Sequence, residues 1–214
     1  MPLPPPQNII PLRPSNHEGA ARVAMSWLEE RHRKGWNNAF QGLLAHWRPQ
    51  GPGGDWQLDE DGITMVAINA GEWLLARGQI HARGGPREIN GYLLGHDGPH
   101  LTPGQRAWIA QLREQPLRLY RVTDVRRDEG LTLVDELDVQ AEPRVVRERR
   151  GSRSARPGML LGARLMQVGD DADGHLELSG AIYPFIKPRE AQVLAQVRQA
   201  LAGAASLKLS AENA

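Results

Sequence analysis

The chain of 214 residues contains no cysteine. This excludes disulfides, thiolate metal sites and cysteine nucleophiles, and it is typical of proteins in a reducing compartment. No apolar run approaches the roughly 20 residues that a membrane-spanning helix needs. The start "MPLPPPQNIIPLRP" also lacks the basic and unbroken apolar segments of a signal peptide. We therefore expect a soluble, cytoplasmic protein that has no membrane partner.

Lysine is scarce, with three lysines against 23 arginines. Schiff-base chemistry and lysine-dependent phosphoryl transfer therefore have few candidate residues. The sequence also lacks a phosphate-binding P-loop, a dinucleotide-binding G-x-G-x-x-G, a nucleophile elbow and an H-E-x-x-H metal motif. These absences disfavour an enzyme, and we predict no catalytic residue, no cofactor and no metal ion.

The patterns that are present predict helices over most of residues 15–114. Ser15 and Glu18 have capping-box spacing, and the apolar residues that follow recur at helical intervals up to Gly35. We expect a second helix after this glycine, ending before "RPQGPGGD". The segment "ITMVAIN" (63–69) is β-rich in type, and a short helix is expected to follow it and to end at Gly78.

A further helix start is predicted at Thr102, where proline occupies the first helical position and Gln105 completes a capping box. The face of this helix that carries Trp108, Ile109 and Leu112 should point inward. From Pro116 onward the apolar period changes from 3.6 to 2, which indicates strands. Five short strands are expected, in "LRLYRVTDV", "LTLVDEL", "PRVVRER", "MLLGARLMQV" and "HLELSGAIYPF".

The predicted fold class is α+β. A helical N-terminal half packs on a C-terminal five-stranded, barrel-like antiparallel β domain with a closing helix over 188–202. The predicted organisation is a proline-rich arm (1–14), a mainly helical region (15–114), the barrel-like domain with its helix (115–203) and a frayed tail (204–214).

The C-terminal block has two specific pieces, "SRSARPG" and "LSGAIYPF". With them, residues 101–186 resemble the C-terminal region of uncharacterised bacterial proteins that occur beside, or fused to, SEC-C zinc-motif segments. The resemblance implies a bacterial protein but no established activity. This chain departs from the pattern in having no cysteine, so it cannot carry the SEC-C metal motif itself.

The arginine-rich stretch "RVVRERRGSRSARPG" (144–158) is the main candidate site. Five-stranded barrels commonly bind polynucleotides on a strand face and its loops, where cations follow the phosphates. We therefore predict a non-enzymatic accessory protein that contacts nucleic acid or a nucleoprotein complex. The same run would also suit the solvated end of a strand or a protein-binding edge. Because both faces become polar toward the end of the strand, it also has the pattern of a long hairpin arm beyond the sheet. The predicted nucleic-acid contacts are Arg144, Arg147, Arg149, Arg150, Arg153 and Arg156.

An alternative is a protein–protein adaptor. All six tryptophans lie between residues 27 and 108, and their simplest role is core packing. An exposed grouping of Trp36, Trp47 and Trp56 would instead form a partner-binding patch, assisted by the arm over residues 1–14.

The third alternative is an enzyme with a site in the turn-rich segment 79–100. It requires His81, His96 or His100 to meet a carboxylate in a pocket. The run "GHDGPH" is interpreted as a turn rather than as a metal site, because Gly98-Pro99 interrupts it.

Overall fold

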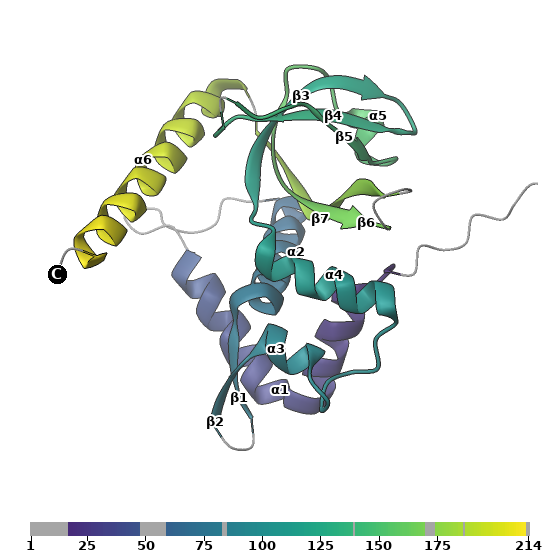
Figure 1. The fold of residues 1–214 in the computed structure, drawn as a ribbon, viewed down its shortest axis with the longest axis vertical. Coiled ribbons are helices and arrows are strands. Elements are labelled where there is room, and N and C mark those ends of the chain that lie inside the picture. Colours follow the sequence, from purple (N-terminus) through teal and green to yellow (C-terminus); the bar gives the residue numbers. More distant parts are fainter. Residues whose placement is uncertain are drawn as a thin grey trace, which may run out of the picture.

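The computed structural model describes residues 17–47, 59–82, 85–138, 140–169, 174–185 and 187–212. They form a helical part, a closed β-barrel above it in the view of Figure 1, and a long C-terminal helix that leaves the barrel to one side. The predicted α+β class is confirmed. Within the described ranges, no helix is both long enough and apolar enough to cross a membrane.

The first helix, α1, spans Ala20–Trp47, and its first half buries a face of alanine and leucine side chains. Two helical segments join within α1, as expected, but they meet at His32, where the backbone departs from helical geometry (φ −133°, ψ 33°), and not at Gly35. Gly35 stays inside the helix where α1 meets the first strand, since a Cβ there would lie 3.6 Å from the carbonyl oxygen of His81.

The second helix, α2, spans Glu60–Arg77, and the predicted β character of 63–69 is wrong. Asp59 caps this helix by accepting a hydrogen bond from the backbone N–H of Gly62 at 2.8 Å. Its second half is almost entirely buried, and it contacts both α1 and α4. Strand propensity is a weak preference, and the Asp59 cap together with the buried second half of α2 outweighs it.

Segment 79–100 forms a short antiparallel ribbon followed by a helix, and α4 comes next. The elements are β1 (Gln79–Ala82), β2 (Gly85–Glu88), α3 (Ile89–Leu94) and α4 (Pro103–Glu114). The predicted start of α4 is confirmed. Its capping box is complete, with the Thr102 side chain accepting from the N–H of Gln105 and the Gln105 side chain accepting in return. The apolar face predicted to point inward is buried.

The barrel consists of β3 (Arg118–Arg126), β4 (Gly130–Asp135), β5 (Arg144–Arg147), β6 (Leu160–Val168) and β7 (His175–Phe185). Its closed order is β3-β4-β5-β7-β6, as expected for a barrel of five strands. β5 and β7 run parallel, and the other pairs are antiparallel. The first strand thus pairs with the second and the fourth, and the third runs beside the fifth. This is the connectivity of the Greek-key barrel known as the OB fold.

Two hydrophobic cores share strand β6. Leu161, Ala163 and Leu165 face the interior of the barrel. Met166 and Val168 pack instead against the core of the helical part. Because side chains alternate across a strand, β6 serves both cores and joins the helical part to the barrel.

Between these cores lies a polar junction of three buried side chains. The hydroxyl of Ser179 on β7 donates to Oε1 of Glu72 on α2 at 2.6 Å. Nε of Arg164 on β6 lies 3.8 Å from Oε2 of the same carboxylate. Gly180, with φ +72°, follows Ser179, and a Cβ there would lie 2.7 Å from Oε2 of Glu72. Burial raises the pKa of Glu72, although the Ser179 bond and the Arg164 charge oppose this shift.

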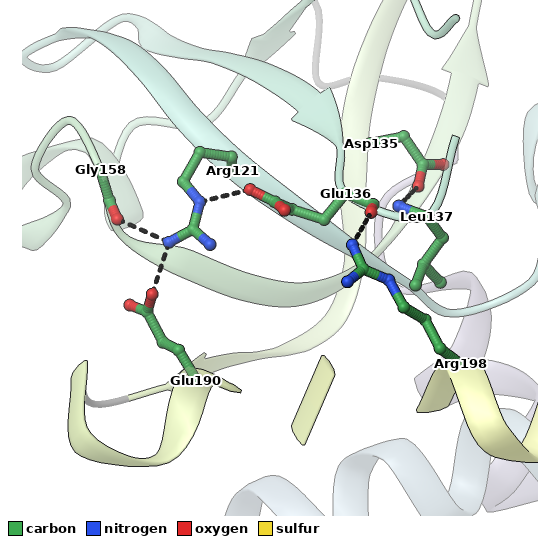
Figure 2. Close-up of polar contacts among 7 residues, drawn as sticks. All are labelled: Arg121, Asp135, Glu136, Leu137, Gly158, Glu190 and Arg198. Carbon is green, nitrogen blue, oxygen red and sulfur yellow. Dashed lines mark hydrogen bonds and ion pairs between the residues drawn. The ribbon is translucent and has the colours of Figure 1, made fainter. Parts of the chain in front are cut away.

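The last helix, α6, spans Lys187–Glu212 and is tied to the barrel near its start by one ion pair and one hydrogen bond (Figure 2). Arg121 on β3 donates from Nε to Glu136 at 2.5 Å and from Nη1 to Glu190 on α6 at 2.7 Å. Nη2 of Arg198, two turns further along α6, donates to the backbone carbonyl oxygen of Glu136 at 3.3 Å.

The length of α6 differs from the predicted 188–202, and the expected frayed tail is helical as far as Glu212. The segment from Leu201 onward is rich in alanine and leucine, which favour helix without needing a partner. None of the side chains described between 187 and 202 is fully buried. Most of the length of α6 therefore projects away from the barrel (Figure 1).

Candidate nucleic-acid interface on the barrel

A cleft of about 870 Å³ opens on the face of the barrel formed by β4 and β5. It is bounded by the β3–β4 turn, both strands, the start of β7 and Glu18 just before α1. In OB folds, ligands bind on the face of the second and third strands and on the loops beside them. β4 and β5 are the second and third strands of this barrel. The cleft therefore lies where this architecture normally holds its ligand.

The register of β4 and β5 decides which side chains reach the cleft. Gly130 lies opposite Arg147, and a Cβ on this glycine would overlap the carbonyl oxygen of Val146. The side chain of Val146 is 0% exposed and fills the barrel. Its neighbours Val145 and Arg147 therefore point outward, and Val145 is 61% exposed.

A short helix, α5 (Gly151–Ser154), holds the β3–β4 turn in place. Asp128 in this turn has a positive φ of 65°, which an aspartate tolerates better than most residues. Its backbone N–H donates to the hydroxyl of Ser152 at 3.0 Å, and its carboxylate accepts from Nε of Arg153 at 2.5 Å. The hydrogen bond from Arg153 lowers the pKa of Asp128.

The six predicted arginines are all exposed. They do not form the long arm considered from the sequence, because β5 ends at Arg147 and the chain turns into α5. Arg147 and Arg149 line the cleft. Arg150 follows them directly, while Arg144 lies at the opposite end of β5 and Arg156 lies beyond α5. The structure therefore brings two of the six, Arg147 and Arg149, to the cleft.

Five of these six arginines form no ion pair with a carboxylate of the described residues. The exception is Arg153, which bonds Asp128. The acidic run "VDELD" (134–138) engages other arginines, since its Asp135 pairs with Arg118 and its Glu136 with Arg121. The second acidic run, "GDDAD", lies for the most part outside the described residues.

Sequence reasoning missed two parts of this site. Arg126, at the end of β3, lines the cleft, and Arg127 follows it in the turn. The segment "RRDEG" (126–130) has the composition of a turn, and its two adjacent arginines are the local signal that could have indicated this part of the site. The cleft also carries a set of carboxylates, which no local pattern indicated because their residues come from separate elements. These are Glu18, Asp128, Glu129, Glu148 and Glu177.

A histidine–glutamate arrangement joins this edge of the cleft to the helical part. Glu177 on β7 contacts Nε2 of His175 at 2.7 Å and Nε2 of His17 at 3.0 Å. The ring of His17 stacks on Trp108 of α4, with centroids 4.6 Å apart. Across the described ranges, no three histidine, aspartate or glutamate side chains are grouped so that they could hold a metal ion.

The predicted tryptophan patch does not form as expected. Trp36 is 3% exposed and packs beside Phe40, because it lies on the inner face of α1. Trp47 is half-buried and lies edge-on to Trp73, with ring centroids 6.4 Å apart. Trp56 and the proline-rich arm lie outside the described residues.

No known protein family, no curated protein and no solved structure matches this chain. The resemblance to proteins associated with SEC-C segments therefore stays a prediction. The OB connectivity rests on the strand order and the pairings alone.

Proposed function

We propose that the protein is a binding protein that contacts the phosphate backbone of nucleic acid through arginines at the β4–β5 face of its barrel. The observation that carries this proposal is a set of exposed guanidinium groups that form no ion pair with a carboxylate of the described residues, beside a cleft at the ligand face of an OB-type barrel. Arg126, Arg147 and Arg149 line the cleft, and Arg127 and Arg150 adjoin them in the chain.

Guanidinium groups suit this role because they pair with phosphate oxygens in a bidentate geometry and remain charged at all relevant pH values. An arginine that already bonds a carboxylate contributes less to the free energy of phosphate binding, because the existing contact must first be broken. Arg153 is in that situation with Asp128. We therefore assign Arg153 to holding the turn rather than to the ligand.

The carboxylates in the cleft constrain how a strand would lie. They repel phosphates, so the backbone would follow the arginines at the edge instead of entering the cleft. Carboxylates accept hydrogen bonds from base amino groups, as Glu and Asp do from cytosine N4. The arrangement therefore supports a strand whose phosphates face the arginines and whose bases face the cleft.

The test measures the affinity for fluorescently labelled single-stranded and double-stranded oligonucleotides over a series of salt concentrations. The affinity should fall steeply with salt, because phosphate contacts release counterions. Changing Arg147, Arg149 and Arg150 together to alanine should weaken binding by at least about tenfold and reduce the salt slope by about 2–3.

The matched control removes three exposed cations elsewhere, with Arg33, Lys34 and Arg189 changed to alanine. It lowers the net charge by the same amount and should leave the affinity within about twofold of the wild type. Equal losses in the two triple variants would mean that only net charge matters. That result, or no binding at low salt, would reject the proposal.

The adaptor alternative is favoured by one observation, the exposure of Trp73. It is 40% exposed on α2 and packs on Trp47, so it leaves an aromatic surface between two helices. Tryptophan is enriched among the residues that dominate protein interfaces. This alternative expects no salt-dependent oligonucleotide binding. It also expects a stoichiometric protein partner that is lost with Trp73→Ala and with deletion of residues 1–14.

A further inference from the structure

We propose that a second cleft, in the helical part of the molecule, binds a small phosphate-bearing ligand through Arg31, His32, Arg87 and Tyr92. This cleft has a volume of about 800 Å³, which is within the range of ligand pockets. It lies between α1, the β1–β2 ribbon and α3, and it shares no lining residue with the cleft on the barrel.

The break in α1 places the central group of this site. His32 is the residue whose backbone leaves helical geometry. Nε2 of its ring lies 2.9 Å from the hydroxyl of Tyr92 on α3. The two rings meet edge to face at 5.3 Å, and Trp27 packs beside both. The histidine is thus held at a fixed point of the cleft wall by aromatic contacts.

Two guanidinium groups lie close enough to act on this histidine. Burial, then the charge of Arg31, then the charge of Arg87 lower the pKa of His32. The guanidinium of Arg87 lies 5.3 Å from the centre of the Tyr92 ring, which fixes it over the same wall. Two cations therefore line the same cleft as the His32 ring, and their charges add to the effect of burial in lowering its pKa.

The remaining charged and titratable groups around the cleft are few. Glu30 comes from α1, His81 from β1 and Asp97 from the turn after α3. Asp97 is 70% exposed and lies 3.8 Å from Arg87. This contact is long and solvated, so it contributes little to holding Arg87.

A phosphate group suits the four side chains of the proposed site, two guanidinium groups, a histidine and a tyrosine, better than a carboxylate does. It carries close to two negative charges at neutral pH and offers three acceptor oxygens. These can be shared among two guanidinium groups, the Tyr92 hydroxyl and a protonated His32. Binding would offset the two positive charges that contribute to lowering the pKa of His32, and so would raise this pKa. By linkage, phosphate binds more tightly to the protonated form.

The test follows the His32 ring by NMR as the pH is varied, in chloride and in millimolar inorganic phosphate at equal ionic strength. The pKa of His32 should rise by about 1 in phosphate, which corresponds to about tenfold tighter binding to the protonated form. Glycerol 3-phosphate should act as phosphate does, and acetate should have little effect. An unchanged titration in phosphate would overturn the proposal, and an equal effect of acetate would overturn the assignment to phosphate.

Arg31→Gln and Arg33→Gln form a matched pair, since both residues are exposed on α1 and only Arg31 lines the cleft. Arg31→Gln should weaken phosphate binding by about tenfold, the size of one lost charge-assisted contact. Arg33→Gln should stay within about twofold of the wild type. Equal effects of the two changes would show that general surface charge is responsible, and would reject the site.

Discussion

At the scale of single residues, the buried junction of Glu72, Arg164 and Ser179 is the least expected feature of the molecule. Arg164 and Glu72 are 6% and 4% exposed, and the guanidinium also donates to the backbone carbonyl oxygens of Leu112 and Gln115 at 2.5 Å each. A buried ion pair contributes little net stability, but removing one member leaves a charge without its partner. The junction therefore fixes how the helical part meets the barrel more than it adds stability.

The raised pKa of Glu72 predicts a specific pH dependence. The folded state holds this proton to higher pH than the unfolded chain, whose glutamates titrate near 4.5. Between these two pKa values the folded state binds more protons, so the contribution of Glu72 to the free energy of unfolding falls as the pH rises. Glu72→Gln removes this dependence.

The measurement is chemical denaturation of the wild type and Glu72→Gln at a series of pH values above 4.5. The difference in unfolding free energy, wild type minus variant, should decrease with pH and then level off. The slope of this difference against pH is the relevant quantity. Glu72→Gln also removes the counterion of Arg164, which changes the stability of the variant by a constant amount at every pH. Glu60→Gln, in the exposed first turn of the same helix, should keep the pH dependence of the wild type. Parallel curves for wild type and Glu72→Gln would contradict this account.

At the scale of elements, α6 depends on few contacts. Its start is held by the Arg121–Glu190 ion pair, in which the side chains are 23% and 12% exposed. Helices usually owe their stability to a buried face, and the side chains described along α6 offer only half-buried ones. Polar contacts therefore carry more of its attachment than is usual.

Glu190→Gln should loosen α6 without unfolding the barrel. The expected loss is about 1 kcal/mol, because the pair is charged on both sides but partly solvated. Native-state hydrogen exchange should show amides of α6 exchanging about fivefold faster, with barrel amides little changed. The control is Glu88→Gln, which breaks the Arg113–Glu88 pair, whose side chains are 50% and 56% exposed. It should lower the free energy of unfolding by less than about 0.5 kcal/mol. Equal loss of protection in α6 and the barrel would contradict the prediction.

The elements that the sequence predicted well have strong local signals. The capping box at Thr102 and the change of apolar period after Pro116 were both confirmed, since each depends on neighbours in the chain. The errors lie where tertiary contacts decide. Gly35 does not end α1, because the helix packs on β1 there, and 63–69 is helical, because α2 lies between α1 and α4.

At the scale of the whole molecule, the five-stranded barrel was predictable but its strand order was not. The pairing of β5 with β7 joins residues about thirty positions apart and follows from no local pattern. The same limit applies to the site. The arginines of β5 were visible in the sequence, while Arg126 and the carboxylates of the cleft come from separate elements and meet only when the barrel closes.

The central claim is that nucleic acid binds at the β4–β5 face. The most direct test is an NMR titration of the full chain with a short oligonucleotide, following the backbone amides. Signals of residues 126–132 and 144–150 should shift first and most, and those of α6 should stay in place. Shifts centred on α6 or on the helical part, with the β4–β5 amides unmoved at saturation, would contradict the account.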